Sequence, residues 1–205
     1  ITVLTLQRNS GFAMACNTGA VAAETPLVCL LNSDVLPIQP GWLAPLVQQL
    51  EDAPGALVAP LLLYDNGLIQ HAGMDVQKRV DGSALPACCH PLKGLHLSQL
   101  EQLSPDGKPY RVEALSGAAM VLARQRFLDL GGFDPVFGRG DFEDLELSLR
   151  WRREGGDLWI VPEAVLTHLE RQSISRTPDV LGRWRQILNA WLAKALCPEL
   201  APMNA

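Results

Sequence analysis

One uninterrupted apolar segment, residues 26–31 (Pro-Leu-Val-Cys-Leu-Leu), constrains the fold of this chain more than any other feature. A run of this kind predicts a strand that is buried on both faces, as in a parallel sheet. It ends in Asn32, Ser33 and Asp34, where the chain is expected to leave the sheet. Ligands of open α/β sheets bind at the carboxyl ends of strands, and a carboxylate there suits a hard divalent cation that bridges phosphates. The same three residue types also begin ordinary turns, so the triplet alone leaves both readings open.

Strands and helices alternate along the chain. They are separated by helix-end and turn signals at Pro40-Gly41, Pro54-Gly55 and Asp65-Asn66-Gly67, of which the last is typical of a hairpin. The predicted elements are a strand at 1–6, a helix at 13–23, a strand at 27–31, a helix after Pro40-Gly41, a strand at 58–63 and a long surface loop at 78–110. This order predicts an α/β sandwich with a mostly parallel central sheet, in which strand 27–31 is central.

The composition fits one domain of this class. The chain has 205 residues, of which 48% are hydrophobic, and this is enough for one sizeable core. Its net charge of -5 favours no nucleic-acid partner, and its apolar runs are too short to span a bilayer. The five cysteines include no C-x-x-C pair, which indicates reduced thiols in a cytoplasmic protein rather than a disulfide framework.

Three acidic residues within four positions, Asp141, Glu143 and Asp144, open a predicted helix that ends at Gly155-Gly156. Acidic residues in a first helical turn cap free N–H groups and complement the helix dipole, and Asp141 is the candidate for that role. Three of them exceed what capping requires, and their mutual repulsion is unfavourable. A first-turn carboxylate that faces a cleft could instead act as a general base toward a hydroxyl group.

The C-terminal segment 180–196 has the period of an amphipathic helix. One face is apolar and consists of Leu181, Trp184, Leu188, Trp191, Leu192 and Ala195, and the polar side carries Arg183, Arg185 and Lys194. The simpler expectation is that the apolar face packs across the domain. The alternative is that a basic helix with two tryptophans rests on an anionic membrane surface.

Several short motifs, taken in their order along the chain, resemble one enzyme family. They are Asn9-Ser10-Gly11-Phe12-Ala13 with Asn17, residues 30–35 followed by Pro40-Gly41-Trp42-Leu43, residues 69–73, Ser116-Gly117-Ala118, Gly131-Gly132-Phe133-Asp134, residues 142–147, and Val161-Pro162-Glu163-Ala164 with His168. The chain resembles the family-2 inverting glycosyltransferases of the GT-A fold, and most of all the bacterial rhamnosyltransferase-type enzymes that build surface polysaccharide. The resemblance extends from about residue 5 to residue 175.

The resemblance implies a function. It implies transfer of a sugar from a nucleotide-sugar donor to a saccharide or lipid-linked acceptor, with inversion and with Mn²⁺ or Mg²⁺ as cofactor. It also implies a cytoplasmic location, in which helix 180–196 could hold the protein at the inner face of the membrane. Because the base and the leaving group lie on opposite sides of the sugar, no second catalytic carboxylate is required.

The resemblance also implies roles for individual residues. Asp144 would be the catalytic base and Glu143 its catalytic partner, which also orients the acceptor beside Ser116 and Gly117. Asp34 and His168 would bind the metal ion, as imidazole can ligate Mn²⁺. The donor nucleotide would be bound by Asn9, Gly11, Asn17, Asn32, Ser33 and Asp34. Asn32 stands where many family members have a further aspartate.

Other polar groups keep two interpretations. His71, at a turn, could face the donor sugar or be a structural histidine. Cys88, Cys89 and His90, with His96 nearby, could suggest zinc, but adjacent cysteines lack the spacing of structural zinc sites.

The start of the chain departs from the family pattern, in which a strand and an acidic turn that bind the nucleobase come first. We expect residues 1–178 to form a GT-A domain that lacks its first β-α unit, about 30 residues long, followed by a helix and tail at 179–205. The alternative function is therefore a non-catalytic remnant that binds nucleotide or sugar. The missing unit would weaken nucleotide binding and leave a strand edge open to self-association. An unrelated nucleotidyltransferase is disfavoured, because no Gly-rich phosphate loop with a lysine is present.

Overall fold

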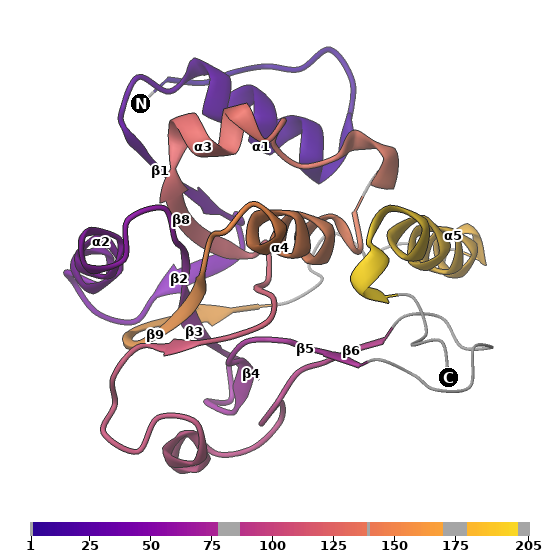
Figure 1. Cartoon of the computed structure of the whole chain (residues 1–205). Coiled ribbons are helices and arrows are strands. Elements are labelled where there is room, and N and C mark those ends of the chain that lie inside the picture. The colour runs from indigo at the N-terminus through magenta and orange to yellow at the C-terminus, as the bar shows by residue number, and fades with distance from the viewer. Residues whose placement is uncertain (1, 78–86, 139, 170–179, 201–205) are drawn as a thin grey trace.

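A mixed β-sheet with helices on both faces forms the centre of the molecule (Figure 1). The computed structural model describes residues 2–77, 87–138, 140–169 and 180–200. The strands are β1 (Leu27–Leu31), β2 (Val35–Pro37), β3 (Leu57–Leu63), β4 (Ile69–His71), β5 (Asp75–Gln77), β6 (Ala87–Cys89), β7 (Tyr110–Arg111), β8 (Ala119–Ala123) and β9 (Leu158–His168). The α-helices are α1 (Gly11–Ala22), α2 (Leu43–Asp52), α3 (Arg124–Asp129), α4 (Glu143–Arg153) and α5 (Val180–Leu196), and the 3₁₀ helices are η1 (Leu97–Gln102), η2 (Pro135–Phe137) and η3 (Pro198–Leu200).

The main sheet has the strand order β1-β8-β3-β9-β2, with β4 beside β3 and β7 beside β9. The α/β class is confirmed, but the expectation of mostly parallel pairing is wrong. Among the pairs in the described part of the chain, only β3 and β9 are parallel. The strands β1, β3 and β9 nevertheless run in one direction, because β8 is antiparallel to both β1 and β3. Their carboxyl ends therefore point toward the same edge of the sheet.

The strand that is buried on both faces is β3, not β1. All seven residues of β3 are buried, whereas burial alternates along β1 and leaves Cys29 and Leu31 exposed. Within the described residues, β1 pairs with β8 alone and ends the path of strands, so it is not central as predicted. Both segments are unbroken apolar runs, and the sequence does not distinguish a central strand from one with a single covered face.

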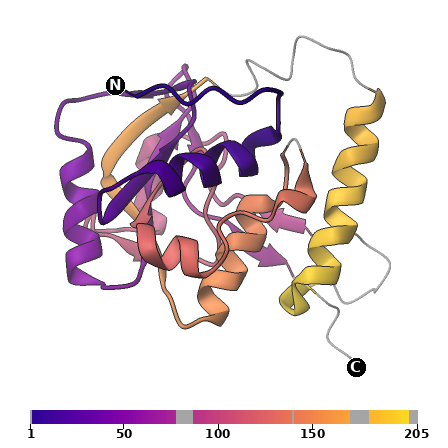
Figure 2. The ribbon, with the colours of Figure 1, turned by 90° about the horizontal axis from the view of Figure 1, so that it is seen from above.

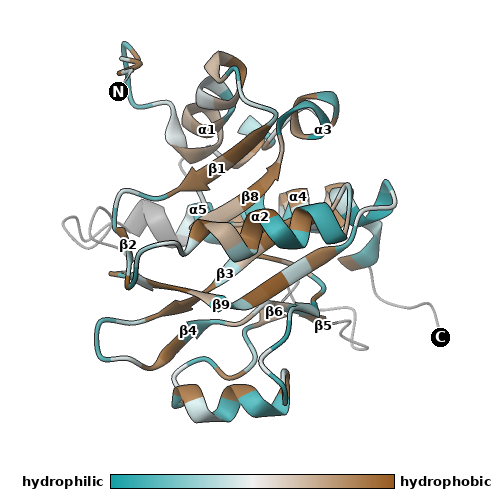
Figure 3. Ribbon diagram, turned by 90° about the vertical axis from the view of Figure 1, so that its left-hand side faces the viewer, coloured by the Kyte–Doolittle hydropathy of each residue, from teal (hydrophilic) through white to brown (hydrophobic). Residues whose placement is uncertain are grey.

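Helices cover the two faces of the sheet unequally. The helices α1, α3 and α4 pack on one face around Phe127, Phe133 and Trp151, which are all fully buried. On the other face, α2 packs through Leu46 and Leu50, as the pattern after Pro40-Gly41 predicts. Figure 3 shows the strands mostly brown and the turn of α2 that faces the viewer teal, so the apolar side of this helix lies on the sheet. No helix in the described residues is long and apolar enough to cross a bilayer.

Helix α5 stands along one side of the molecule, beside α4 (Figure 2). It packs through Ala193 against α4, as does Cys197 directly after the helix, and Asn189 is buried as well. The predicted apolar face does not pack across the domain: Trp184 is 67% exposed, Leu188 58% and Trp191 56%. Ala193 and the partly buried Leu192, rather than the two tryptophans and Leu188, make the contact. The side chains of Leu181 and Arg183 lie outside the described residues.

The remaining elements test the local predictions. Residues 2–6 form no strand, because no described strand pairs with them, and Val3, Leu4 and Leu6 are exposed. The hairpin turn is confirmed, since β3 and β4 are antiparallel and the Leu68 N–H donates to Asn66 Oδ1. The expected loop at 78–110 contains β6 and η1, and residues 78–86 lie outside the described residues.

Candidate active site

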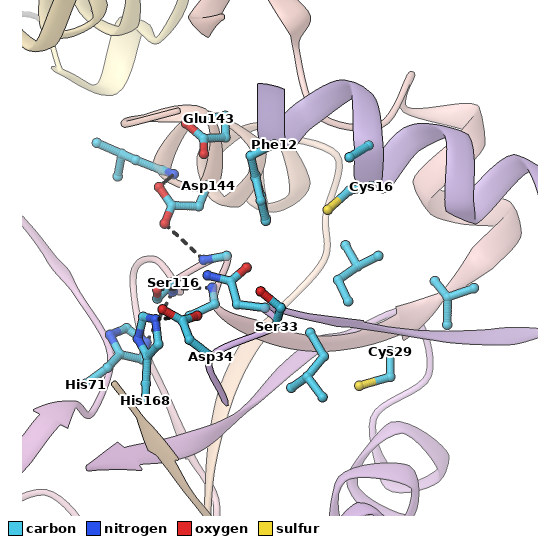
Figure 4. Close-up of a pocket in the computed structure, with 18 of the residues that line it drawn as sticks. Phe12, Cys16, Cys29, Ser33, Asp34, His71, Ser116, Glu143, Asp144 and His168 are labelled. Atoms are coloured by element: carbon cyan, nitrogen blue, oxygen red, sulfur yellow. Dashed lines mark hydrogen bonds and ion pairs between the residues drawn. The ribbon is translucent and has the colours of Figure 1, made fainter. Parts of the chain in front are cut away.

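A cavity of about 1100 Å³ opens where the strands β1 and β9 end (Figure 4). It brings together residues that are more than 130 positions apart in the chain, from Asp34 to His168. The predicted site residues that line it are Asn32, Ser33, Asp34, Ser116, Gly117, Glu143, Asp144 and His168. The cavity therefore has the location that the apolar run and its polar triplet predict. The roles of these residues remain predictions.

One side of the cavity, here called the metal-side wall, consists of Asp34 and His168. Strand pairing builds it: Val35 of β2 lies opposite His168 of β9, and the Leu169 N–H donates to the carbonyl of Asp34. The ring nitrogen Nε2 of His168 lies 3.4 Å from Asp34 Oδ1. A carboxylate oxygen and an imidazole nitrogen are suitable ligands for Mn²⁺, so this donor pair fits a divalent cation. The described residues hold no group of three or more His, Cys, Asp or Glu that is placed to bind a metal ion, so water and the donor's phosphates would supply the other ligands.

The opposite side, here called the acid-side wall, consists of Glu143 and Asp144 at the start of α4 (Figure 4). Asp144 accepts hydrogen bonds from two backbone groups, the Gly117 N–H at 2.9 Å and the Leu145 N–H at 2.8 Å. Burial raises the pKa of Asp144, and these two hydrogen bonds oppose that rise. Each carboxylate oxygen has two lone pairs, so Asp144 can still accept a proton from a bound hydroxyl. The capping role expected of Asp141 is wrong, because its side chain caps nothing and the residue is exposed.

Glu143 differs from its neighbour in having an unsatisfied oxygen. It is only 7% exposed, and its Oε2 atom is buried with no hydrogen-bond partner. Burial, followed by repulsion from Asp144, raises the pKa of Glu143 to about 8. A pKa near 8 favours the protonated form of Glu143 at neutral pH. The N–H groups of Gly117 and Leu145 favour the charged form of Asp144, which is the form that a base requires.

The backbone before α4 is held in an unusual conformation. Asp141 and Phe142 have φ angles of +76° and +78°, which residues other than glycine rarely adopt. Asn189 of α5 fixes this turn, because its Nδ2 group donates to the carbonyls of Phe137, Gly140 and Asp141 at 2.8–3.1 Å. Sequence reasoning missed Asn189, since a single asparagine on a helix carries no signal of such a contact.

Ser116 and Gly117 connect the two walls. The Ser116 N–H donates to His71 Nε2, and Gly117 approaches Asp144 so closely that an added Cβ would lie 3.3 Å from the Asp144 Cβ. Burial, followed by the charges of His90, Lys93 and His168, lowers the pKa of His71 to about 3, so this histidine is neutral. It accepts a backbone hydrogen bond, which favours the structural interpretation, although it also lines the cavity.

Three residues expected to bind the donor do not line the cavity: Asn9, Gly11 and Asn17. The side chain of Asn17 makes two hydrogen bonds to the backbone of Phe133 and so joins α1 to the turn before η2. Asn9 accepts from the Gly11 N–H at the start of α1. The side chains of Asn9 and Asn17 thus make hydrogen bonds within the fold.

Comparison with known proteins agrees with this fold. The model of the family described as "Glycosyl transferase family 2" matches residues 1–84. Residues 1–84 thus resemble glycosyltransferase family 2, and the chain has the GT-A fold. It is 31% identical over 190 residues to the O-antigen biosynthesis protein RfbC of Myxococcus xanthus, covering 91% of this chain and 14% of that protein. It is 32% identical over 175 residues to the pre-mycofactocin glycosyltransferase of Mycobacterium tuberculosis, covering 85% and 33%.

Two further proteins are similar to the chain. An inactive polypeptide N-acetylgalactosaminyltransferase-like protein 5 of Macaca fascicularis is 25% identical over 199 residues, covering 94% of this chain and 44% of that protein. The crystal structure of GalNAc-T7 with UDP, GalNAc and Mn²⁺ superposes with a TM-score of 0.65 at 22% identity, over 87% of this chain and 34% of that one, which shows a common fold. The chain thus spans less than half the length of these relatives.

Proposed function

We propose that this domain transfers a sugar from a nucleotide-sugar donor to a hydroxyl of a saccharide or lipid-linked acceptor, with inversion at the anomeric carbon. The observation that carries the proposal is the cavity with two unlike walls, a metal-side wall of Asp34 and His168 and an acid-side wall of Glu143 and Asp144. Opposite walls suit a direct displacement, because base and leaving group must lie on opposite faces of the sugar.

On the metal-side wall, Asp34 and His168 would hold Mn²⁺ or Mg²⁺. When bound, the cation stabilises the negative charge on the departing nucleoside diphosphate. Asn32 and Ser33, at the same strand end, lie where they can contact the donor. The presence of UDP and Mn²⁺ in the GalNAc-T7 crystal supports this kind of donor and cofactor.

On the acid-side wall, Asp144 takes the proton of the acceptor hydroxyl as the oxygen attacks the anomeric carbon. The new glycosidic bond forms while the bond from that carbon to the diphosphate oxygen breaks, so the nucleoside diphosphate leaves with the bonding electrons. Ser116, Gly117 and Glu143 position the acceptor beside Asp144. Because its pKa of about 8 favours the protonated form at neutral pH, Glu143 adds no negative charge that would repel the carboxylate of Asp144.

The biological setting is also a proposal. The name of the Myxococcus xanthus relative, an O-antigen biosynthesis protein, supports a role in bacterial surface polysaccharide synthesis, in the cytoplasm. The relative named as inactive supports the alternative, a domain that binds nucleotide or sugar without turnover.

The decisive experiment incubates the full-length protein with Mn²⁺ and a panel of nucleotide sugars and measures nucleoside diphosphate release with and without oligosaccharide acceptors. We expect acceptor-dependent release, a product of inverted anomeric configuration by NMR, and loss of activity with a chelator. Asp34→Asn should lose both activity and metal-dependent nucleotide binding, and Asp65→Asn, on the exposed hairpin turn, is the control. Tight metal-dependent nucleotide binding without release would favour the non-catalytic alternative, and retention of configuration would exclude the displacement.

We further propose that helix α5 rests on an anionic membrane surface. Its outer face exposes Trp184, Ile187, Leu188 and Trp191, and Lys194 lies 5.5 Å from the ring centre of Trp191. The helix has three basic and no acidic residues in a chain of net charge -5, so its charge is complementary to anionic lipid. Such contact would bring a lipid-linked acceptor near the acid-side wall, which α5 supports through Asn189.

Vesicle co-sedimentation tests this contact. The protein should bind phosphatidylglycerol-containing vesicles in a salt-sensitive way and pure phosphatidylcholine vesicles weakly, and a Trp184→Ser/Trp191→Ser variant should lose binding while Gln186→Ser keeps it. Equal binding by both variants would refute the proposal. A concentration-dependent dimer disrupted by the tryptophan changes would show that a second copy covers this face instead.

A further inference from the structure

Gln70 is a buried polar residue next to the metal-side wall. It lies on β4, is 4% exposed, and makes two hydrogen bonds to His168. Its amide Nε2 donates to the backbone carbonyl of His168 at 3.2 Å, and its Oε1 lies 2.7 Å from the ring nitrogen Nδ1 of the same residue. Because the amide nitrogen contacts the backbone of His168 and the amide oxygen contacts its ring, Gln70 fixes the position of both.

These two contacts determine where the proton of the His168 ring lies. A backbone carbonyl can only accept hydrogen bonds, so the amide atom that faces it must be the nitrogen. The other amide atom, which faces Nδ1, is therefore the oxygen, and it also can only accept. It follows that Nδ1 carries the proton, and in neutral His168 the other nitrogen, Nε2, is left with a free lone pair.

This lone pair faces a second acceptor. Nε2 lies 3.4 Å from Asp34 Oδ1, so two electron-rich atoms face each other when the ring is neutral. Two such atoms repel unless a cation lies between them, and metal-binding histidines generally donate the other ring N–H to an acceptor of this kind. The Gln70 amide oxygen supplies that acceptor here.

We propose that Gln70 is a positioning residue that sets the tautomer of His168, so that the Nε2 lone pair and the Asp34 carboxylate together bind one divalent cation. The inference rests on the proposed metal-dependent function and adds a residue that makes no direct contact with the ion. The competing interpretation is a structural ion pair, in which a protonated His168 donates from Nε2 to Asp34.

The direct test is NMR of the full-length protein with ¹⁵N-labelled histidine at neutral pH, in which the His168 signals are those missing from a His168→Ala variant. We expect the neutral tautomer with the proton on Nδ1, and selective broadening of the Nε2 signal when Mn²⁺ alone is added. A doubly protonated ring, or a proton on Nε2 in the neutral ring, would overturn the proposal whatever any variant does.

A second measurement uses Mn²⁺ binding followed by electron paramagnetic resonance. Gln70→Leu should weaken Mn²⁺ affinity by roughly 10–100-fold, and Gln70→Glu, which keeps an acceptor for Nδ1–H, should weaken it less. The matched control is Gln49→Leu, a buried glutamine on α2 outside the cavity, which should leave affinity unchanged. Unchanged affinity in Gln70→Leu overturns this inference but not the proposed function, whereas a wild-type protein that binds no Mn²⁺ overturns the metal site as a whole.

Discussion

The two walls of the cavity are built by different means. The metal-side wall lies at the ends of regular strands, and the register of β2 and β9 alone brings Asp34 to His168. The acid-side wall follows a turn in which Asp141 and Phe142 have positive φ angles, each at a cost of about 1–3 kcal/mol. Such a strained turn needs stabilising contacts from other parts of the chain, and Asn189 of α5 supplies three hydrogen bonds to its backbone carbonyls. Regular pairing of two strands thus specifies one wall, and a single side chain, Asn189, 48 residues beyond Asp141, holds the turn that specifies the other.

The largest expected effect separates the walls by function. Asp144→Asn removes the proposed base while keeping the size of the side chain, so kcat should fall by about 10²–10⁴-fold. Metal-dependent nucleotide binding, which depends on Asp34 and His168, should remain within about twofold by calorimetry. Glu154→Gln, at the exposed end of the same helix, is the control. Near-normal turnover in Asp144→Asn would leave this residue with only its hydrogen bonds to Gly117 and Leu145.

A smaller effect tests whether α5 maintains the acid-side wall. Asn189→Ala removes the donor for three carbonyls, so stability to urea should fall by about 1–3 kcal/mol. If the strained turn then relaxes, kcat should fall by roughly tenfold, which corresponds to about 1.4 kcal/mol, while nucleotide affinity stays the same. Gln186→Ala removes an exposed amide from the same helix and should change neither. A loss of stability with kcat intact would limit Asn189 to a purely structural role.

The contrast between the walls also explains what the sequence could reveal. Asp34 was predictable, because a polar triplet after an apolar strand marks a strand end, and strand ends are where ligands bind in this fold class. Asn189 was not, because its role depends on three carbonyls of a distant turn. The prediction of the central strand was wrong for a related reason. The runs at 27–31 and 57–63 are both apolar, and only the pairing in the folded sheet shows which is central. In α5 the period was correct, but residues other than the tryptophans face the domain.

The smallest effect lies within the acid-side wall and depends on pH. Burial and the neighbouring Asp144 charge raise the pKa of Glu143 from 4.5 to about 8. Between these values the folded protein holds a proton that the unfolded chain has lost, so the free energy of unfolding must fall as pH rises through this window. Glu143→Gln cannot ionise, so its stability curve should be flatter and should exceed that of the wild type most clearly near pH 8 and above.

Urea titrations of both proteins from pH 5 to roughly pH 9, a range that spans this window, measure the difference. Glu163→Gln, an exposed change on β9, should keep the wild-type pH dependence. Turnover measurements test the protonation state of Glu143 as well. Neutral Glu143 is the form expected at pH 7, and the glutamine variant resembles that form. Glu143→Gln should therefore retain far more turnover at pH 7 than Asp144→Asn. If instead Glu143→Gln loses turnover and Asp144→Asn keeps it, then Glu143 takes the proton, and the assignment of the two carboxylates must be exchanged.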